Sequence, residues 1–198
     1  EIPVKYIGAL SRLEQKETAS SYDIMVLLSG PEPQRTELEE ILMHELKHYK
    51  GQVLFVRGVV EAEQKVTRKE QVKIVNFMET EDLQNAICSS DLVICRSGYT
   101  TIMDLFKLGK KAFFIPTPGQ TEQEYLTKNF MQEGICFAQK QNKFDFEKCD
   151  VRNLNSVKKI FMSKILVFNS LGGPEVLEFQ NFRISKLSEI RLTKSHES

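Results

Sequence analysis

The sequence predicts an α/β fold in which a mostly parallel sheet of about six strands is covered by helices on both faces. Two observations predict it: short continuous apolar runs alternate with longer segments of helical periodicity, and glycine or proline follows most of these elements. Continuous apolar runs are typical of strands that are buried on both faces, as in parallel sheets. Successive strand–helix units place such strands side by side.

Six strands are expected from the apolar runs, over residues 23–28, 52–56, 72–77, 91–95, 111–115 and 135–138. The first run, DIMVLL, ends at Ser29-Gly30-Pro31, and the fifth, KAFFI, is stopped by Pro116. The segment 61–71 is polar and of mixed charge, so we expect a solvated loop there.

Helices are expected over residues 36–49, 80–88, 97–109, 121–132, 156–169 and 175–187. In the first of them Leu38, Leu42 and Leu46 recur at helical spacing, and Gly51 follows its end. Residues 1–22 resemble a linker, and the break at Gly172-Gly173-Pro174 separates a last helix and tail, 171–198.

The composition excludes several classes of protein. The chain has 198 residues, of which 41% are hydrophobic, with 27 basic and 27 acidic side chains. The apolar content excludes intrinsic disorder, and balanced charge argues against a nucleic-acid binder, because affinity for phosphate backbones comes from surplus lysine and arginine. No apolar stretch is long enough for a membrane span, and no signal-peptide pattern is visible. Because the sequence lacks an initiator Met, we expect a piece of a longer protein.

Two patterns that suggest metal or thiol chemistry have simpler interpretations. The cysteines Cys88, Cys95, Cys136 and Cys149 form no CxxC pair, so we expect buried thiols in a reducing compartment. The segment from His44 to His48 spells HExxH, a zinc-protease pattern. We interpret it as an exposed helix face, because the apolar stripe of that helix lies elsewhere. The sequence therefore predicts no metal site.

Ligands of open parallel sheets bind beyond the carboxyl ends of the strands, where loops enter helices. The loop around Gly30 is the first candidate, because a glycine there lets backbone approach a ligand. Taken alone, this signal is weak, since tight turns of this kind are common.

The second candidate loop, from Arg96 to Thr101, brings together hydroxyl groups, Gly98 and the first N–H groups of a helix. That combination suits a diphosphate. Asp104 lies one helical turn beyond Thr101, where a carboxylate can accept hydrogen bonds from two vicinal ribose hydroxyls. The alternative is that Ser97 only caps the helix and that Asp104 only complements its dipole.

The third candidate loop runs from Pro116 to the helix start, where Gln120, Gln123 and Glu124 crowd together. Side-chain amides and carboxylates are suited to sugar hydroxyls, because each can pair with adjacent donors and acceptors. The alternative is a solvated first turn with favourable acidic residues.

The second and third candidate loops lie within one stretch of sequence that resembles a known family. The sequence DLVICRSGYTTIMDLFKLGKKAFFIPTPGQTEQEYLTKNFMQEGICF resembles the carboxyl-terminal half of the family 28 glycosyltransferases, which have the GT-B fold. That family carries a strand ending in Arg-Ser-Gly, a Thr and an acidic residue on the next helix, a proline loop and a Gln-rich helix start. The pattern is similar to that of the bacterial peptidoglycan N-acetylglucosaminyltransferases. The resemblance implies that residues 23–170 form a Rossmann-like domain that binds a nucleotide sugar.

The resemblance implies roles for the loop residues of the second half. Ser97, Gly98 and Thr101 match positions near the donor diphosphate, and Asp104 matches a ribose-binding glutamate that is one methylene longer. The pair Gln123-Glu124 matches a paired glutamine that holds the transferred sugar, from which Glu124 departs.

Loops of the first half also receive roles from the resemblance. Phe77 and Met78 match the segment whose backbone contacts the uracil edge, and Gly30 matches a glycine loop under the sugar nucleotide. Arg57 lies in a loop that borders the nucleotide pocket. The expected donor-binding residues are therefore Gly30, Arg57, Phe77, Met78, Arg96, Ser97, Gly98, Thr101, Asp104, Gln120, Gln123 and Glu124.

As a function, the resemblance implies the donor-binding half of an inverting glycosyltransferase that uses a UDP-sugar, with UDP-N-acetylglucosamine as the candidate donor and no metal or other cofactor. No second doubly wound pattern is present, so we expect the acceptor site and the catalytic base in a separate amino-terminal domain. The fragment alone is then expected to be inactive. Its expected partners are the nucleotide sugar, that domain and a membrane-associated lipid-linked or glycan acceptor. The protein itself is expected in the cytoplasm, where it could lie peripherally at the inner face of the membrane.

Two other hypotheses stay open. The chain could be a stand-alone donor-binding subunit that docks on a membrane partner, or a non-catalytic nucleotide-binding module on the same scaffold. If the expected helix 175–187 has lost its packing partner, its apolar residues form an exposed patch that can drive a homodimer.

Overall fold

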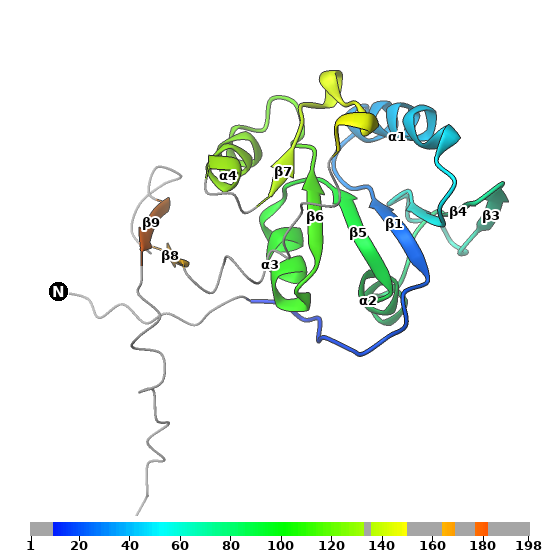
Figure 1. The fold of residues 1–198 in the computed structure, drawn as a ribbon, viewed down its shortest axis with the longest axis horizontal. Coiled ribbons are helices and arrows are strands. Elements are labelled where there is room, and N and C mark those ends of the chain that lie inside the picture. The colour runs from blue at the N-terminus through cyan, green and yellow to red at the C-terminus, as the bar shows by residue number, and fades with distance from the viewer. Residues whose placement is uncertain (1–9, 133–135, 150–163, 169–176, 182–198) are drawn as a thin grey trace, which may run out of the picture.

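The computed structural model describes residues 10–132, 136–149, 164–168 and 177–181 (Figure 1). Seven strands form one sheet in the order β3-β4-β2-β1-β5-β6-β7. Figure 1 shows β3 at one edge of this sheet and β7 at the other. All neighbours in the sheet are parallel except β3 and β4, which confirms the predicted α/β fold class.

The elements follow the predicted alternation. Their order is β1 (Tyr22–Leu27), α1 (Gln34–Glu45), η1 (Leu46–His48), β2 (Val53–Val56), β3 (Val66–Lys69), β4 (Val72–Val75), α2 (Thr80–Cys88), β5 (Ser90–Cys95), α3 (Tyr99–Leu108), β6 (Lys111–Phe114), α4 (Thr121–Gln132), β7 (Phe137–Ala138), η2 (Gln141–Lys143), η3 (Phe146–Lys148), β8 (Lys164–Phe168) and β9 (Leu177–Asn181).

Each face of the sheet has its own apolar core. In β1, Ile24 and Val26 belong to a cluster that also contains Leu42 of α1, whereas Met25 packs in a second cluster with residues of α2, α3 and α4. Side chains alternate between the two faces of a strand, so a strand covered on both sides must be apolar at every position. This burial on both faces explains the continuous apolar runs.

The strand order reverses between β1 and β5. From β1 the chain builds outward through β2 to β4 on one side, and from β5 through β6 to β7 on the other. The strand ends are level, because Leu27 pairs with both Val56 and Cys95, and Cys95 pairs with Phe114. The loops after these strands therefore meet at one edge, and the reversal point is where such sheets bind ligands.

The loop expected over residues 61–71 contains an additional strand, β3, so the sheet has seven strands rather than about six. β3 pairs antiparallel with β4 through a two-residue turn in which Glu70 adopts φ 53°. All four residues of β3 are exposed, so the strand lacks the apolar run that marks its neighbours. Charged side chains on an edge strand are common, because they discourage pairing with another chain.

The helices expected at 156–169 and 175–187 are wrong where the structure describes these segments. Residues 164–168 and 177–181 form the antiparallel strands β8 and β9. The sequence KILVF is rich in β-formers, and in LEFQN apolar and polar residues alternate with a period of two. The rest of both ranges, and with it most of the proposed dimerisation surface, lies outside the described residues.

The described part of the expected linker, residues 10–21, lies along the domain. Leu13 is buried in the cluster that contains α2 and α3, and the Glu14 N–H donates to Gln84 Oε1 at 2.9 Å. At the other end of the segment, the Ser20 hydroxyl donates to Asp91 Oδ1 at 2.8 Å. Among the described residues, no helix combines the length and the apolar character needed to cross a membrane.

Candidate functional site

The amino terminus of α3 opens at the reversal point of the sheet. Gly98 is the N-cap residue, and no side chain forms a capping hydrogen bond there. A Cβ atom added at Gly98 would meet no atom within 4 Å, so space lies open in front of the helix. The φ of Gly98, −66°, is one that any residue can adopt. The absence of a side chain, rather than backbone freedom, is therefore what this glycine provides.

The electrostatics of α3 differ from those of the other three α-helices that begin at this edge. The first turns of α1, α2 and α4 contain acidic residues, and the first turn of α3 contains none. A helix amino terminus carries a partial positive charge and N–H groups without intrahelical partners. In α3 no carboxylate of the first turn offsets this charge, so the opening is suited to an anion.

Ser97 and Thr101 flank this opening. Ser97 is fully buried, and its hydroxyl donates to the carbonyl of Gln123 at 3.2 Å, which ties the start of α3 to the first turn of α4. It is not the helix cap, because Gly98 takes that position. Thr101 is half-buried in the first turn of α3.

Arg96 lies beneath the opening and is 1% exposed. Its guanidinium donates to the carbonyls of Ile115 and Pro116, to the carbonyl of Gln34 at 2.7 Å and to Gln141 Oε1 at 2.7 Å. Desolvation lowers the pKa of Arg96 to about 10, against the opposing effect of Glu37. Arg96 therefore stays charged at neutral pH. Its hydrogen bonds hold together the loop after β6, the start of α1 and η2.

Gly30 and Thr117 bring the first and third candidate loops together. Gly30 has φ +104°, which favours glycine, and a Cβ there would lie 3.7 Å from Thr117 Oγ1. Thr117 is 2% exposed, and its hydroxyl has no hydrogen-bond partner within the described residues. Buried hydroxyls are normally paired, so the unpaired Thr117 hydroxyl is an unusual feature of the junction between these two loops.

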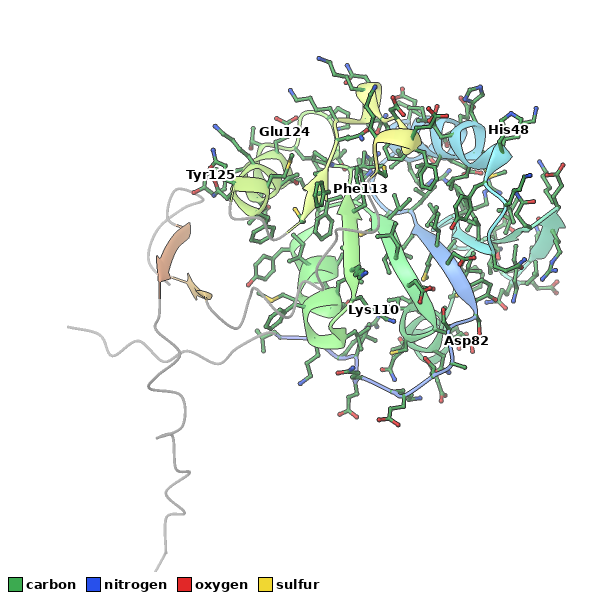
Figure 2. All side chains as sticks on the ribbon, in the orientation of Figure 1. His48, Asp82, Lys110, Phe113, Glu124 and Tyr125 are labelled. Atoms are coloured by element: carbon green, nitrogen blue, oxygen red, sulfur yellow. The ribbon has the colours of Figure 1, made fainter. Side chains whose placement is uncertain are left out.

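The three polar side chains at the start of α4 have different environments. Gln123 Oε1 accepts a hydrogen bond from the Thr117 N–H at 3.0 Å, and Gln123 Nε2 donates to Gln120 Oε1. Gln123 therefore stabilises the loop between β6 and α4. Glu124 is exposed on the outer surface, as Figure 2 shows. It lines a groove of about 590 Å³ whose walls are Gln34, Glu37, Glu40, Ile41, Pro116, Pro118, Glu124, Lys140, Gln141 and Asn142.

An arginine–glutamate network fixes the loop after β2. Arg57 Nε donates to Glu39 Oε1 at 2.6 Å, and Arg35 Nη1 donates to Glu39 Oε2 at 2.8 Å and to the Arg57 carbonyl at 3.2 Å. Burial lowers the pKa of Arg35, but its hydrogen bonds to Glu32 and Glu39 outweigh that effect and leave it raised. The Arg57 side chain is thus engaged by Glu39.

Our sequence analysis did not identify Arg35 or Glu39 as site residues. A signal was present, because opposite charges four residues apart face each other on a helix. The second contact, from Glu39 to Arg57, joins residues 18 positions apart on different elements, and no local pattern predicts it.

Phe77 and Met78 follow β4 and are half-buried. The Gln64 side chain donates to the Phe77 carbonyl at 2.9 Å. The preceding residue, Asn76, is 4% exposed, accepts from the Lys65 N–H at 2.7 Å and donates to the Glu63 carbonyl at 2.9 Å. Asn76, which the sequence analysis also missed, holds the loop after β2 beside this end of β4.

Asp104 lies further along α3 and is half-buried. Its Oδ1 accepts a hydrogen bond from the Ser11 hydroxyl at 2.6 Å. Asp104 is three residues after Thr101, so both residues lie on one face of the helix. Thr101 and Asp104 thus share a face of α3, Ser97 and Gly98 lie at its start, and the Gly30 loop follows the neighbouring strand β1.

The two histidines of the HExxH pattern lie away from this edge. His44 is exposed near the end of α1. His48 is exposed in η1, as Figure 2 shows. In the part of the chain that the structure describes, no group of three His, Cys, Asp or Glu side chains could hold a metal ion. The four cysteines are free and buried, as predicted.

Comparison with known protein families identifies the chain as a member of a glycosyltransferase family. The family "Glycosyltransferase family 28 C-terminal domain" matches residues 34–161, more than half of the chain. The chain therefore belongs to this family, as the sequence resemblance predicted.

Curated relatives are UDP-N-acetylglucosamine–N-acetylmuramyl-(pentapeptide) pyrophosphoryl-undecaprenol N-acetylglucosamine transferases. That of Histophilus somni is 30% identical over 99 residues, 48% of this chain and 27% of the relative. That of Haemophilus influenzae is 32% identical over 91 residues, 45% of this chain and 24% of the relative. The matched region thus spans about a quarter of the length of these relatives.

Two solved structures overlap larger shares of both chains. MurG of Acinetobacter baumannii is 19% identical with a TM-score of 0.49, covering 74% of this chain and 41% of that one. The glycosyltransferase SnogD of Streptomyces nogalater is 15% identical with a TM-score of 0.49, covering 75% of this chain and 39% of that one.

Proposed function

We propose that this chain binds the nucleotide sugar of a glycosyltransferase reaction, and that the donor is a UDP-sugar. The observation that carries the proposal is the amino terminus of α3, which opens at the strand-order reversal with space in front of Gly98 and no acidic side chain in its first turn. Membership of family 28 supports a transferase, and the names of the relatives contain UDP-N-acetylglucosamine.

In this proposal the diphosphate lies against the first N–H groups of α3, between Ser97 and Thr101. The proposal places the backbone of the Gly30 loop, which approaches Thr117, beside the diphosphate. Charge develops on the diphosphate as the sugar leaves, and a helix dipole and fixed hydrogen-bond donors stabilise that charge without reorganisation. No metal or other cofactor has a role in this step.

The two ends of the donor then extend in opposite directions along the sheet edge. The uridine lies toward Phe77 and Met78 after β4, and Asp104 accepts hydrogen bonds from the ribose. The sugar lies toward the start of α4, where Gln120, Gln123 and Glu124 are grouped and the groove lined by Glu124 begins.

In this proposal, the chemical step also requires groups that lie outside this chain. An inverting transfer requires a base for the acceptor hydroxyl, and we assign both the base and the acceptor site to a separate amino-terminal domain. The names of the relatives suggest a lipid-linked acceptor, which would bring the enzyme to the cytoplasmic face of a membrane. The isolated chain would bind the donor without transferring its sugar.

Titration of the chain with UDP, followed by calorimetry or by NMR, tests the proposal. Thr101→Ala is expected to weaken UDP binding by about 1–3 kcal/mol, the range for a lost hydrogen bond to a charged or buried partner. Thr67→Ala, on the exposed strand β3, is the matched control and should bind like the wild type. A folded protein that shows no binding at millimolar UDP contradicts the proposed function.

A further inference from the structure

One hydrogen bond links the segment before the sheet to the middle of α3. The Ser11 hydroxyl donates to Asp104 Oδ1 at 2.6 Å and accepts from the Leu13 N–H at 3.0 Å. The two partners of the first bond are 93 residues apart in the sequence. Leu13 is 1% exposed and packs in the core cluster with residues of α2 and α3, so it anchors Ser11 at this position.

The bond restrains the Asp104 carboxylate. A hydroxyl that donates to a carboxylate forms a short, charge-assisted hydrogen bond, and the 2.6 Å distance has that character. The bond engages Oδ1 alone, and Oδ2 accepts no hydrogen bond within the part of the chain that the structure describes. Because one oxygen is held, rotation of the carboxylate is restrained, and with it the direction in which the other oxygen points.

We propose that Ser11 is a positioning residue for the nucleotide ribose, which it orients through Asp104. This inference rests on the proposed function, because it takes the ligand to be a uridine nucleotide. Asp104 shares a helix face with Thr101 in the first turn of α3, and an aspartate reaches less far than a glutamate. Ser11 compensates for the shorter side chain by holding the carboxylate in one rotamer, with Oδ2 available to the ribose hydroxyls. The segment around Ser11 is thereby part of the binding site.

Two substitutions at Ser11 test the proposal. Ser11→Ala is expected to weaken UDP binding about tenfold, because the carboxylate loses its fixed orientation. Ser11→Thr keeps the hydroxyl and is expected to stay within about twofold of the wild type. Ser20→Ala is the matched control, since Ser20 donates to Asp91 in the same way, on an exposed part of the same segment. Its UDP affinity should be that of the wild type.

A second ligand separates positioning from a general loss of structure. 2′,3′-Dideoxyuridine diphosphate lacks both ribose hydroxyls, so the wild type should bind it more weakly than UDP, and Ser11→Ala should bind it as the wild type does. If Ser11→Ala lowers the melting temperature, Asp104→Asn serves as a second variant, because it keeps the side-chain shape. It should likewise bind UDP more weakly than the wild type and bind the dideoxy nucleotide as the wild type does.

Equal losses on both ligands, or no loss on UDP, would overturn the role of Ser11 while leaving the proposed function in place. Absence of UDP binding by the wild type would overturn both.

Discussion

Two glycines at the strand ends differ in what they contribute. Gly58 has φ +70°, and a Cβ there would lie 2.3 Å from the Leu28 carbonyl oxygen, so both conformation and space require glycine. Gly98 has ordinary backbone angles and open space in front of it. The first glycine is thus needed by the fold, whereas the second leaves room for the ligand.

Alanine at each position separates these contributions. Gly58→Ala is expected to lower the free energy of unfolding by about 2–4 kcal/mol, because strain and a backbone clash add together. Gly98→Ala should change it by less than about 0.5 kcal/mol but weaken UDP binding, since the new methyl group enters the diphosphate space. Urea denaturation and UDP titration of both variants measure this. A destabilised Gly98→Ala variant would contradict the distinction.

The site residues also show what a sequence reveals at the level of single positions. Ser97, Gly98 and Thr101 are recognisable because they follow one another at a strand end. The contacts of Arg96, Glu39 and Ser11 join distant elements, so no local pattern contains them. Arg96 was expected to bind the donor, and the structure places it beneath the loops, because burial depends on what packs above a residue.

Helices and strands depend on contacts at their ends. The last turn of α2 is capped by Lys110, whose ammonium group donates to the Cys88 carbonyl at 2.6 Å and to the Ser90 carbonyl at 2.8 Å (Figure 2). Burial lowers the pKa of Lys110. A cation at a helix carboxyl terminus also offsets the partial negative charge of its carbonyls. Lys110 therefore joins the end of α2, the start of β5 and the end of α3.

Lys110→Met tests this cap. The variant keeps most of the side-chain volume but leaves two carbonyls without their donor, so the free energy of unfolding should fall by about 1–3 kcal/mol. UDP affinity should be unchanged, because Lys110 lies at the opposite end of α3 from Gly98. Lys107→Met, an exposed residue of the same helix, is the control. Denaturant unfolding measures both; equal stability of the two variants would contradict the capping role.

Among the strands of the sheet, the buried strands were predicted from the sequence and the exposed strand β3 was missed. β2, β5, β6 and most of β1 appear as apolar runs because both of their faces are covered, whereas β4, which is only partly buried, contains Lys73. β3 is exposed along its length, and pairing with β4 holds it in place. The strands β8 and β9 were mistaken for helices because short apolar runs fit either period.

For the molecule as a whole, the proposed function predicts a linkage between ligand and stability. A ligand that binds only the folded chain stabilises it by about 2.7 kcal/mol at a hundredfold excess over Kd. The melting temperature should therefore rise by several degrees with UDP, by about 4 °C or more, and by less for Gly98→Ala. Differential scanning fluorimetry with and without UDP measures this. Equal shifts with UDP and with inorganic phosphate would indicate an anion effect without nucleotide recognition.

The Arg96 guanidinium has a further consequence for ligand capture. It joins the loop after β6, the start of α1 and η2 through hydrogen bonds to protein atoms alone. The loops around the proposed ligand site are therefore held together by the fold itself, and binding of a ligand requires little additional ordering. Differences in affinity between ligands of such a preorganised site are expected mainly in their dissociation rates.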